Sequence, residues 1–433
     1  MPRRGKVRTD SLLSQLSATV VKSFMNVEYM VGRAAGVLVK PLSLIVTNYL
    51  FGNFLASELA AAFLAVMVLN GLLGFDLHRD FYSAYFSLKK SSMLAHRYQD
   101  YLSSLIAVSF LGALIIIFFF SLKGKLVVLS AIAIGVYFFS ERMIDESLRF
   151  ELYAERFESW GRFATVRGLF QGLAFGTASF ILVQVEFEPI AALVGSMALG
   201  NFAVFFVLKS GVSSRRAAIK RLSSVRRWPE AVGRMVDVNK IYWLISALGI
   251  LLSISDRLVV SLVAFEKLAY FSLLASCFSI MVMSLDYLVF SMARGKLLRG
   301  DITSREIIMS SKCLIVLFFS SVCGGVAAAA LPAVYPGVAV DYWLVVFVFM
   351  LQLCVAITVI PREFVYWHCA PVVLVAIELG AVLMGVIWVW LSSISPWPIR
   401  GALLGLFLVL IFRFFVLEWL SGRAAASSRL AVQ

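Results

Sequence analysis

The stretch "SISDRLVVSLVAFEKLAYF", Ser253 to Phe271, places an aspartate and an arginine inside a long apolar run. The apolar residues continue to Ala264, a short turn with Glu266 and Lys267 follows, and a second apolar run then begins. Two apolar runs separated by so short a turn predict two membrane helices joined on one side of the bilayer. Charged residues inside such a helix are costly, so their presence indicates a role.

The composition of the whole chain is that of an integral membrane protein. Of its 433 residues, 61% are hydrophobic and 15% are charged, and the mean hydropathy is +0.91. These values lie well outside those of soluble domains. A helix needs about 20 mostly apolar residues to cross a bilayer, and windows of that length recur along the chain.

We therefore predict an all-α polytopic membrane protein with about twelve transmembrane helices. The predicted spans are residues 28–50, 55–86, 101–121, 126–141, 163–184, 190–209, 240–262, 268–293, 313–335, 341–360, 364–391 and 397–420. The fourth span is short, and we expect it to continue into the charged segment after it. The second, eighth and eleventh are long enough to tilt or to project beyond the lipid.

The net charge of +14 falls almost entirely on alternate loops. The loops on the opposite side hold only Lys123, Lys125, Lys267 and Arg400. By the positive-inside rule both termini are cytoplasmic, as an even number of spans requires. Basic residues spread over short alternate loops indicate topology, not a nucleic-acid footprint, so we exclude nucleic acid as a partner.

A basic segment divides the chain into two halves with six predicted spans each. We predict a cytoplasmic N-terminus with an interfacial amphipathic helix, an N-lobe, a basic linker, a C-lobe and a cytoplasmic tail, at residues 1–27, 28–209, 210–239, 240–420 and 421–433. The five cysteines include no C-x-x-C pair and no histidine at ligand spacing, so we expect neither a disulfide framework nor a metal site. No removable signal peptide is predicted.

An internal similarity supports the division, although chance identity in an alanine-rich window is the alternative. An offset of 208 positions pairs Ala56 with Ala264, Glu58 with Glu266, Ala61 with Ala269 and Phe63 with Phe271. We interpret both segments as the outer turn between a lobe's first two spans. Parallel six-helix repeats usually hold a substrate at the lobe interface and rock around it, which makes transport the leading function class.

In its layout of spans and in one sequence pattern, the chain resembles a known family. The layout of spans and the pattern "SDRLVVSLVAFEKLAYFSLLAS" are similar to those of the polysaccharide flippases, including O-antigen flippases, of the multidrug, oligosaccharidyl-lipid and polysaccharide exporter superfamily. The family places a polar residue late in span seven, then a small hydrophobic run, an acidic or glycine turn and a tyrosine. Here these are Asp256, the run to Ala264, Glu266 and Tyr270. The turn lacks the glycines common in the family, which leaves the subfamily open.

The resemblance implies a V-shaped, two-lobed flippase of the bacterial inner membrane that works by alternating access. Its substrate would be an undecaprenyl-pyrophosphate-linked oligosaccharide, such as an O-antigen, exopolysaccharide or capsule repeat unit. Other implied partners are membrane lipids and polysaccharide-assembly proteins. No cofactor is expected, and a proton or sodium gradient is the candidate energy source. Nothing in the composition indicates which sugar is carried.

Ionisable residues inside the predicted spans are the candidate site residues. At a rise of about 1.5 Å per residue, they sort by depth into a cytoplasmic third (Arg33, Arg79, Arg167 and Arg413), a middle (Lys40 and Glu378) and an outer third (Asp256 and Arg257). Cations spaced along a water-filled cavity would replace the hydration of a pyrophosphate as it crosses, and arginine suits bidentate phosphate binding. We assign substrate binding to Arg33, Lys40, Arg79 and Arg257.

Coupling or structural polar roles are predicted for Asp256, Glu378, Arg167 and Arg413. Glu378 is either an ion-coupling site or the neutralising partner of a basic residue. Asp256 is expected to orient Arg257 through a third group, and reversed roles fit equally. All four arginines of the cytoplasmic third lie near enough to the inner surface to snorkel, which is the preferred interpretation of Arg167 and Arg413.

Two rival functions remain. An ion-coupled multidrug exporter of the same superfamily would favour acidic residues for cationic drugs, whereas the deep charges here are mostly basic. A membrane glycosyltransferase or polysaccharide polymerase would present its chemistry on sizeable outer loops. The outer segments here are short, and the sequence has neither a H-E-x-x-H motif nor a Walker A loop.

Overall fold

A computed structural model describes residues 27–73, 92–122, 128–153, 157–185, 187–207, 228–288, 302–335, 341–395 and 397–430. Within these residues the chain forms helices and no strands. The predicted N-terminus of residues 1–27, with its interfacial helix, falls almost wholly outside the described part, as do residues 210–227 of the predicted linker. The described part of the linker after these residues is helical and begins α10.

The first half of the described chain contains six helices. They are α2 (Val27–Phe51), α3 (Asn53–Leu72), α5 (Ser92–Leu122), α6 (Val128–Tyr153), α7 (Phe157–Leu182) and α8 (Pro189–Val207). We call them the N-terminal helices. In this group α2 packs on α7, α7 on α8, and α6 on both α5 and α8.

The second half begins with a long helix that is broken near its end. Its elements are α10 (Trp228–Ser253), α11 (Ser255–Val263), the 3₁₀ turn η2 (Phe265–Lys267), α12 (Leu268–Leu288), α14 (Ser304–Ile308), α15 (Ser311–Val334), α16 (Tyr342–His368), α17 (Pro371–Ser393) and α18 (Pro398–Leu430). We call them the C-terminal helices. Here α12 packs on α15 and α16, α18 on α16 and α17, and α10 on α17.

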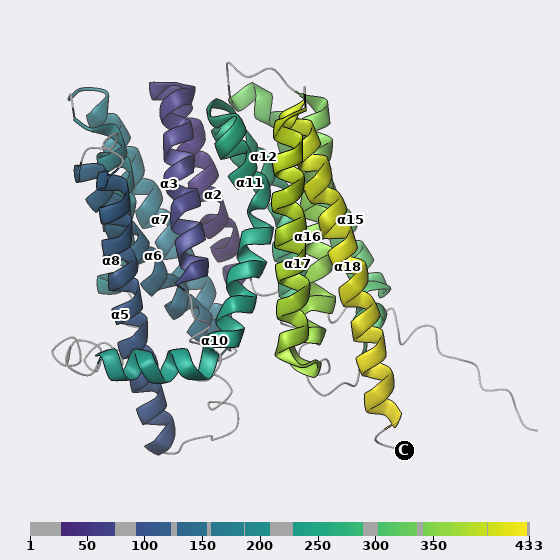
Figure 1. Cartoon of the computed structure of the whole chain (residues 1–433). Helices are drawn as coiled ribbons and strands as arrows, with labels where there is room; N and C mark the ends of the chain where they lie inside the picture. Colours follow the sequence, from purple (N-terminus) through teal and green to yellow (C-terminus); the bar gives the residue numbers. More distant parts are fainter. Residues whose placement is uncertain are drawn as a thin grey trace, which may run out of the picture.

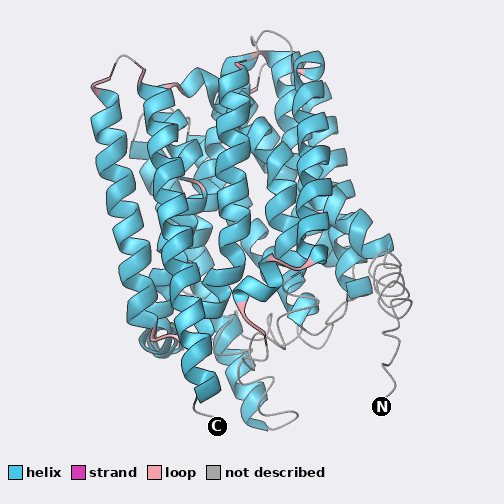
Figure 2. Cartoon of the chain, turned by 90° about the vertical axis from the view of Figure 1, so that its right-hand side faces the viewer, coloured by secondary structure: helices cyan, strands magenta, loops and turns pink. Residues whose placement is uncertain are grey.

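The two groups of helices stand side by side, with α10 and α11 between them (Figure 1). Contacts between the groups are made by α3 with α10, α11 and α12, and by α5 with α10. The long helices run between the two ends of the molecule, and the described loops lie mostly at those ends (Figure 2). We call the end at which α3, α12, α16 and α18 begin the upper end, as in Figure 1.

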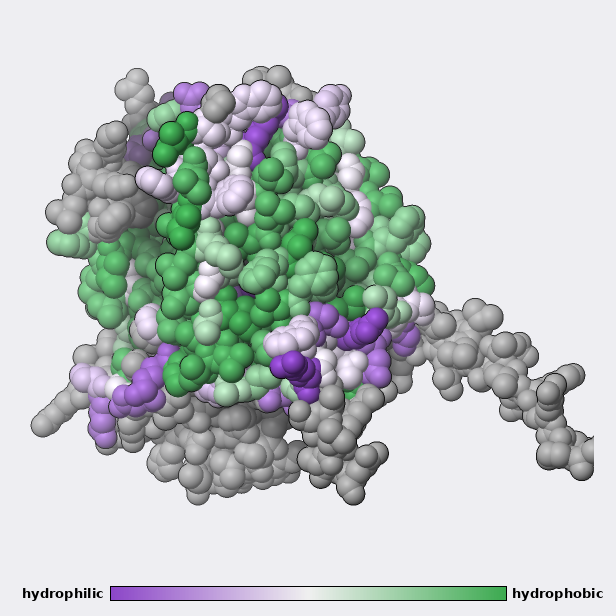
Figure 3. Space-filling model, turned by 45° about the vertical axis from the view of Figure 1, so that its right-hand side comes forward, coloured by the Kyte–Doolittle hydropathy of each residue, from purple (hydrophilic) through white to green (hydrophobic). Residues whose placement is uncertain are grey.

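The helices are those of a multi-pass membrane protein. Within the described residues, six helices are long and apolar enough to cross a bilayer, and the α10–α11 pair makes a seventh if it is one bent span. A broad hydrophobic band covers the face drawn in Figure 3, with hydrophilic residues gathered above and below it. Large apolar side chains are exposed in that band, among them Phe318 of α15 and Phe415 of α18, because lipid and not water surrounds them.

Several predicted boundaries differ from the structure, among them those of the second, tenth and eleventh spans. The second span was expected to reach residue 86, but α3 ends at Leu72, where the amide of Leu73 donates to the carbonyl of Leu69 at 2.8 Å. The eleventh span was expected to begin at residue 364. Instead α16 continues to His368 and α17 begins at Pro371, because a proline, which lacks an amide hydrogen, fits the first turn of a helix.

The internal similarity at an offset of 208 residues does not pair equivalent structures. Residues 54–63 lie inside α3, whereas residues 262–271 contain the end of α11, η2 and the start of α12. The first-half turn is instead at Gly52, whose φ of +90° is a conformation that glycine adopts without strain. The interpretation as a turn was therefore wrong for residues 54–63 and correct for residues 262–271, and the four identities carry no evidence for a repeat.

Small residues let α2 and α7 approach closely. A Cβ atom added to Gly32 would lie 2.3 Å from the carbonyl oxygen of Gly161, and one added to Gly168 would lie 2.8 Å from Cβ of Ala35. Helix pairs in membranes commonly associate through such small residues, because close backbones gain van der Waals contact that lipid cannot replace.

We predict that Gly32→Ala lowers thermal stability, because the added methyl group forces the backbones of α2 and α7 apart at a cost of about 1–3 kcal/mol. Unfolding in detergent, followed by tryptophan fluorescence, measures the change. Gly36→Ala is the matched control, since it lies one turn further along α2 and an added Cβ there meets nothing within 4 Å. Equal melting temperatures for the two variants would contradict the close contact.

Candidate functional site

A network of charged side chains lies inside the N-terminal helices and is centred on Glu141 of α6. The Glu141 carboxylate is buried and accepts from Lys40 Nζ of α2 at 2.7 Å and from Arg167 Nη2 of α7 at 2.7 Å. Arg167 Nη1 also donates to Asp145 Oδ1 at 2.9 Å. Two cations thus face two carboxylates. Their ion pairs hold α2, α6 and α7 together within the apolar interior.

Uncharged polar side chains complete this network and connect it to α8. Gln171 Nε2 donates to Asn201 Oδ1 at 2.8 Å, and Asn201 Nδ2 donates to Ser140 Oγ at 3.0 Å and to Glu141 Oε2 at 3.3 Å. A buried carboxylate is costly unless its oxygens are hydrogen-bonded. These amides therefore stabilise the ionised form of Glu141 together with the two cations.

Lys40 is the member of the network that remains accessible. Its side chain is 32% exposed, and Nζ lies 5.9 Å from the ring centroid of Phe63 and 6.0 Å from that of Tyr137. A lysine ammonium has three donors, of which Glu141 takes one. Lys40 can therefore contact an anion on its exposed side while Glu141 fixes its position.

The second site lies at the break between α10 and α11. The two helices meet at an angle of 54°, and the residue between them is Ile254. Asp256, in the first turn of α11, is buried; Oδ1 accepts from the backbone amide of Arg257 at 2.8 Å, and Oδ2 accepts from Gln352 Nε2 of α16 at 3.2 Å. The Asp256 carboxylate thus satisfies an amide freed by the break and ties α11 to α16.

The Arg257 side chain extends from α11 toward the N-terminal helices. Arg257 Nη1 lies 3.6 Å from the sulfur of Met67 in α3, while Nε is buried without a hydrogen-bond partner. No carboxylate of the described residues lies within ion-pair distance of this guanidinium. Arg257 is therefore a cation at the contact between the two groups of helices, with donors left for an anion.

A third cluster joins α16, α17 and α18. Glu378 of α17 is fully buried, and its Oε1 accepts from Arg413 Nη2 of α18 at 2.6 Å and from Arg362 Nε of α16 at 3.0 Å. Arg362 Nη2 also donates to the carbonyl of Ile245 in α10 at 3.3 Å. A Cβ atom at Gly249 would lie 2.5 Å from this guanidinium, so only glycine leaves room for it there.

The two groups of helices are hydrogen-bonded to each other at the upper end. Asn53 Nδ2 and Ser57 Oγ of α3 donate to the carbonyl of Glu266 in η2 at 2.7 and 3.1 Å. The hydroxyl of Tyr335, which follows α15, donates to Asn53 Oδ1 at 2.6 Å. We call these three bonds the upper latch, because they connect α3 to the turn before α12 and to the end of α15.

No family model and no curated protein matches this chain.

The structure places the predicted site residues in three separate positions. Lys40 and Arg167 belong to the Glu141 network, Asp256 and Arg257 lie at the helix break, and Glu378 and Arg413 share one ion pair. Arg33 is part of α2, but its side chain is outside the described residues, as is the whole of Arg79. Both remain predictions.

Two interpretations of single residues change. Arg167 and Arg413 were expected to snorkel to the inner surface, but both are buried and paired with carboxylates, because a partner within reach neutralises the guanidinium inside the protein. Of the two roles left open for Glu378, the structure shows the neutralising partner, with two arginines on one oxygen.

Sequence reasoning missed Glu141, Asp145, Gln352 and Arg362. The fourth span was expected to continue into the charged segment after it, as α6 does to Tyr153, but no role was assigned to Glu141 or Asp145. Arg362 was placed in a loop, whereas α16 continues to His368. Hydropathy windows end where charges accumulate, so they cut off the helix turns that carry buried ion pairs. A signal was present for α6, whose short apolar run alone is too brief to cross a bilayer.

We predict that Glu378→Gln destabilises the protein by about 3–5 kcal/mol, because it leaves the buried guanidinium of Arg413 and the partly buried guanidinium of Arg362 without a counter-ion. Thermal unfolding in detergent measures the loss. Glu266→Gln removes an exposed carboxylate and serves as the control. The double variant Glu378→Gln, Arg413→Gln should recover part of the loss, and an unchanged melting temperature in the single variant would show that the cluster contributes nothing.

A separate prediction concerns the upper latch. Asn53→Ala removes one bond to η2 and the acceptor of Tyr335, so amide hydrogen exchange over residues 262–271 should become faster. Thr177→Ala is the control, because that hydroxyl bonds only the carbonyl of Leu173 in its own helix. Exchange at the wild-type rate in Asn53→Ala would mean that the latch does not hold the turn.

Proposed function

We propose that this protein is a flippase that moves a pyrophosphate-linked, lipid-anchored oligosaccharide across the bacterial inner membrane. In this proposal twelve spans form two lobes, the N-terminal and the C-terminal helices, which rock against each other around the substrate. Both termini are cytoplasmic, so the lower end faces the cytoplasm and the upper end the periplasm. The multi-pass, all-helical fold and the contacts between the two groups are compatible with this mechanism.

One observation carries the proposal, namely the state of Arg257. This guanidinium lies where α11 meets α3, its Nε is buried and without a partner, and no described carboxylate lies within ion-pair distance of it. An unpaired cation inside a membrane protein is expensive and favours a functional role over a structural one. A phosphate is the anion that its planar, bidentate donors fit best.

Two more cations are proposed as phosphate contacts along the route of the substrate. Lys40 and Arg362 each give one bond to a buried carboxylate, yet both keep about a third of the side chain exposed, at 32% and 30%. Arg362 lies against Gly249 in α10, eight residues before Arg257, which corresponds to about 12 Å of helix. A pyrophosphate can then pass between cations whose own positions are fixed by Glu141 and Glu378.

The break at Ile254 is the proposed hinge of the rocking motion. It separates α10, which packs on α5 and α17, from α11, which packs on α3 and α18. Release at the upper end would require the upper latch to open. A proton or sodium gradient is the proposed energy source. Glu378, held by two arginines, fits a structural role better than ion coupling.

We predict that Arg257→Ala reduces transport at least about tenfold, because a hydrogen-bonded charge contact contributes roughly 1.5–3 kcal/mol. The measurement is flipping of a labelled undecaprenyl-pyrophosphate oligosaccharide by purified protein in vesicles. Arg257→Lys keeps the charge but loses the bidentate geometry, so its flipping rate should lie between that of Arg257→Ala and that of the wild type.

Arg305→Ala is the matched control, since it removes an exposed arginine from the short helix α14. Melting temperatures establish that each variant is folded. Wild-type flipping by Arg257→Ala would overturn the assignment of Arg257. Sugar transfer without translocation would point to a membrane glycosyltransferase or polymerase, and transport of cationic drugs alone would point to a multidrug exporter.

A further inference from the structure

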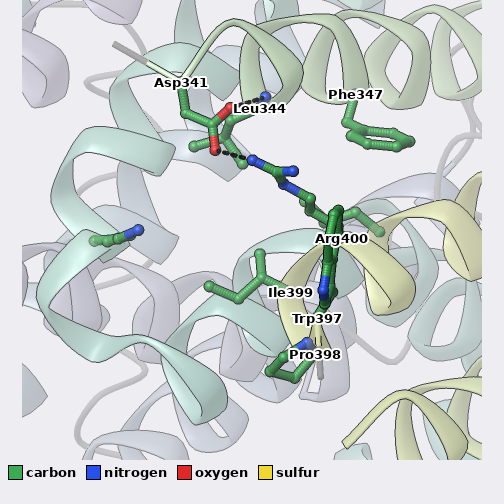
Figure 4. Close-up of a pocket in the computed structure, with 9 residues that line it drawn as sticks. Asp341, Leu344, Phe347, Trp397, Pro398, Ile399 and Arg400 are labelled. Carbon is green, nitrogen blue, oxygen red and sulfur yellow. Dashed lines mark hydrogen bonds and ion pairs between the residues drawn. The ribbon is translucent and has the colours of Figure 1, made fainter. Parts of the chain in front are cut away.

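A cavity of about 370 Å³ lies at the upper end of the C-terminal helices, away from the three charged clusters. It is enclosed by η2, by the start of α16 and by the start of α18 (Figure 4). Lys267 comes from η2, Asp341 precedes α16, and Trp397 and Arg400 lie at the start of α18. Three segments far apart in the sequence therefore contribute to one site.

The charge of the cavity is unbalanced in favour of cations. Asp341 Oδ1 caps α16 by accepting from the amides of Trp343 and Leu344 at 3.1 and 3.4 Å, which leaves Oδ2 to face Arg400 Nη2 at 3.5 Å. That distance is long for a hydrogen bond. The Lys267 ammonium has no ion pair within the described residues, so two cations face one carboxylate that is already engaged.

The other walls of the cavity are apolar. Leu344 and Phe347 of α16 and Ile399 and Leu403 of α18 also line the cavity. The site also lies at the depth of the membrane interface, because exposed aromatic side chains surround the upper end, including Tyr342, Trp343, Trp390 and Trp397. A ligand for this site therefore combines a negative group with an apolar part.

We propose that this cavity binds the phosphate of a membrane lipid, with Lys267 and Arg400 as the phosphate contacts and the walls of α16 and α18 against the start of the lipid chain. Arginine and lysine together supply bidentate and point-charge donors to phosphate oxygens. The start of the 33-residue helix α18 adds the positive end of its dipole to the same space.

A saccharide fits the same cavity less well. Sugar rings are usually held by an open aromatic face, but the guanidinium carbon of Arg400 lies 5.2 Å from the ring centroid of Trp397 and covers one face of it. The one carboxylate that could accept from sugar hydroxyls is engaged by two amides and Arg400. The remaining side-chain donors are the cations Lys267 and Arg400 and the indole N–H of Trp397, a set that favours an anion.

The site adjoins the upper latch, which gives lipid binding a consequence. Lys267 follows Glu266, whose carbonyl accepts from Asn53 and Ser57 of α3. A phosphate bound to Lys267 and Arg400 ties η2 to α18 on the side opposite α3. A lipid bound in this cavity would therefore stabilise the position of η2, the turn that the upper latch also holds in place.

Native mass spectrometry of the full-length protein in detergent tests this site, with short-chain phosphatidylglycerol as the probe and phosphatidylcholine as the neutral comparison. We expect selective retention of phosphatidylglycerol. Lys267→Gln should weaken its binding about tenfold, and Lys267→Gln with Arg400→Gln more strongly, because each charged hydrogen bond accounts for roughly that factor. Arg305→Gln, at an exposed arginine elsewhere, should bind as wild type does.

The single variant Lys267→Gln keeps the test valid if loss of the Arg400 and Asp341 pair affects folding, since the Lys267 ammonium has no ion pair with any described residue. Equal retention of phosphatidylglycerol by wild type and Lys267→Gln would overturn the proposal. So would equal binding of the neutral lipid, or displacement by a soluble oligosaccharide. Displacement by millimolar inorganic phosphate would show that phosphate without a lipid chain is the ligand, and would overturn the lipid source.

Discussion

An ionised side chain surrounded by apolar helices must find a partner, and this constraint organises the interior of the protein. Glu141 and Glu378 each lie at the centre of a different group of helices and each bind two cations. Each carboxylate thereby connects three helices, α2, α6 and α7 in one case and α16, α17 and α18 in the other. Lys40 and Arg362 are held in defined positions as a result, with part of each side chain still exposed.

Against this pattern of pairing, Arg257 is the exception that suggests function. Its neighbour Asp256 does not form a side-chain ion pair with it but binds the Arg257 amide and Gln352. The same bend that frees this amide directs the guanidinium toward α3. The helix break, a guanidinium without an ion pair among the described residues and the contact between the two groups of helices therefore lie at the same position. This arrangement supports the proposal that Arg257 contacts the substrate.

The short turn between α11 and α12 has two different neighbours. On one side it accepts hydrogen bonds from α3 in the upper latch, and on the other its Lys267 lines a cationic cavity with α16 and α18. A turn held from both sides is a natural place for a lipid to influence how the two groups of helices move. This turn contains no glycine and forms the 3₁₀ helix η2, in which the carbonyl of Glu266 accepts in the upper latch and Lys267 lines the cavity.

Long apolar runs and alternate basic loops were enough to predict an all-helical, multi-pass protein, because a bilayer imposes the same length and charge rules on every span. The ranges of α2 and α15 follow from these rules to within two residues, and the start of α12 at Leu268 was predicted to the residue. The end of α3 at Leu72 and the break at Ile254 do not, because they depend on neighbouring helices. The pairing of Arg167, Arg413 and Glu378 likewise required three dimensions. A charged residue in a sequence shows only that its burial would be costly. The helices packed around it decide which partner offsets that cost, and which cation is left without a partner.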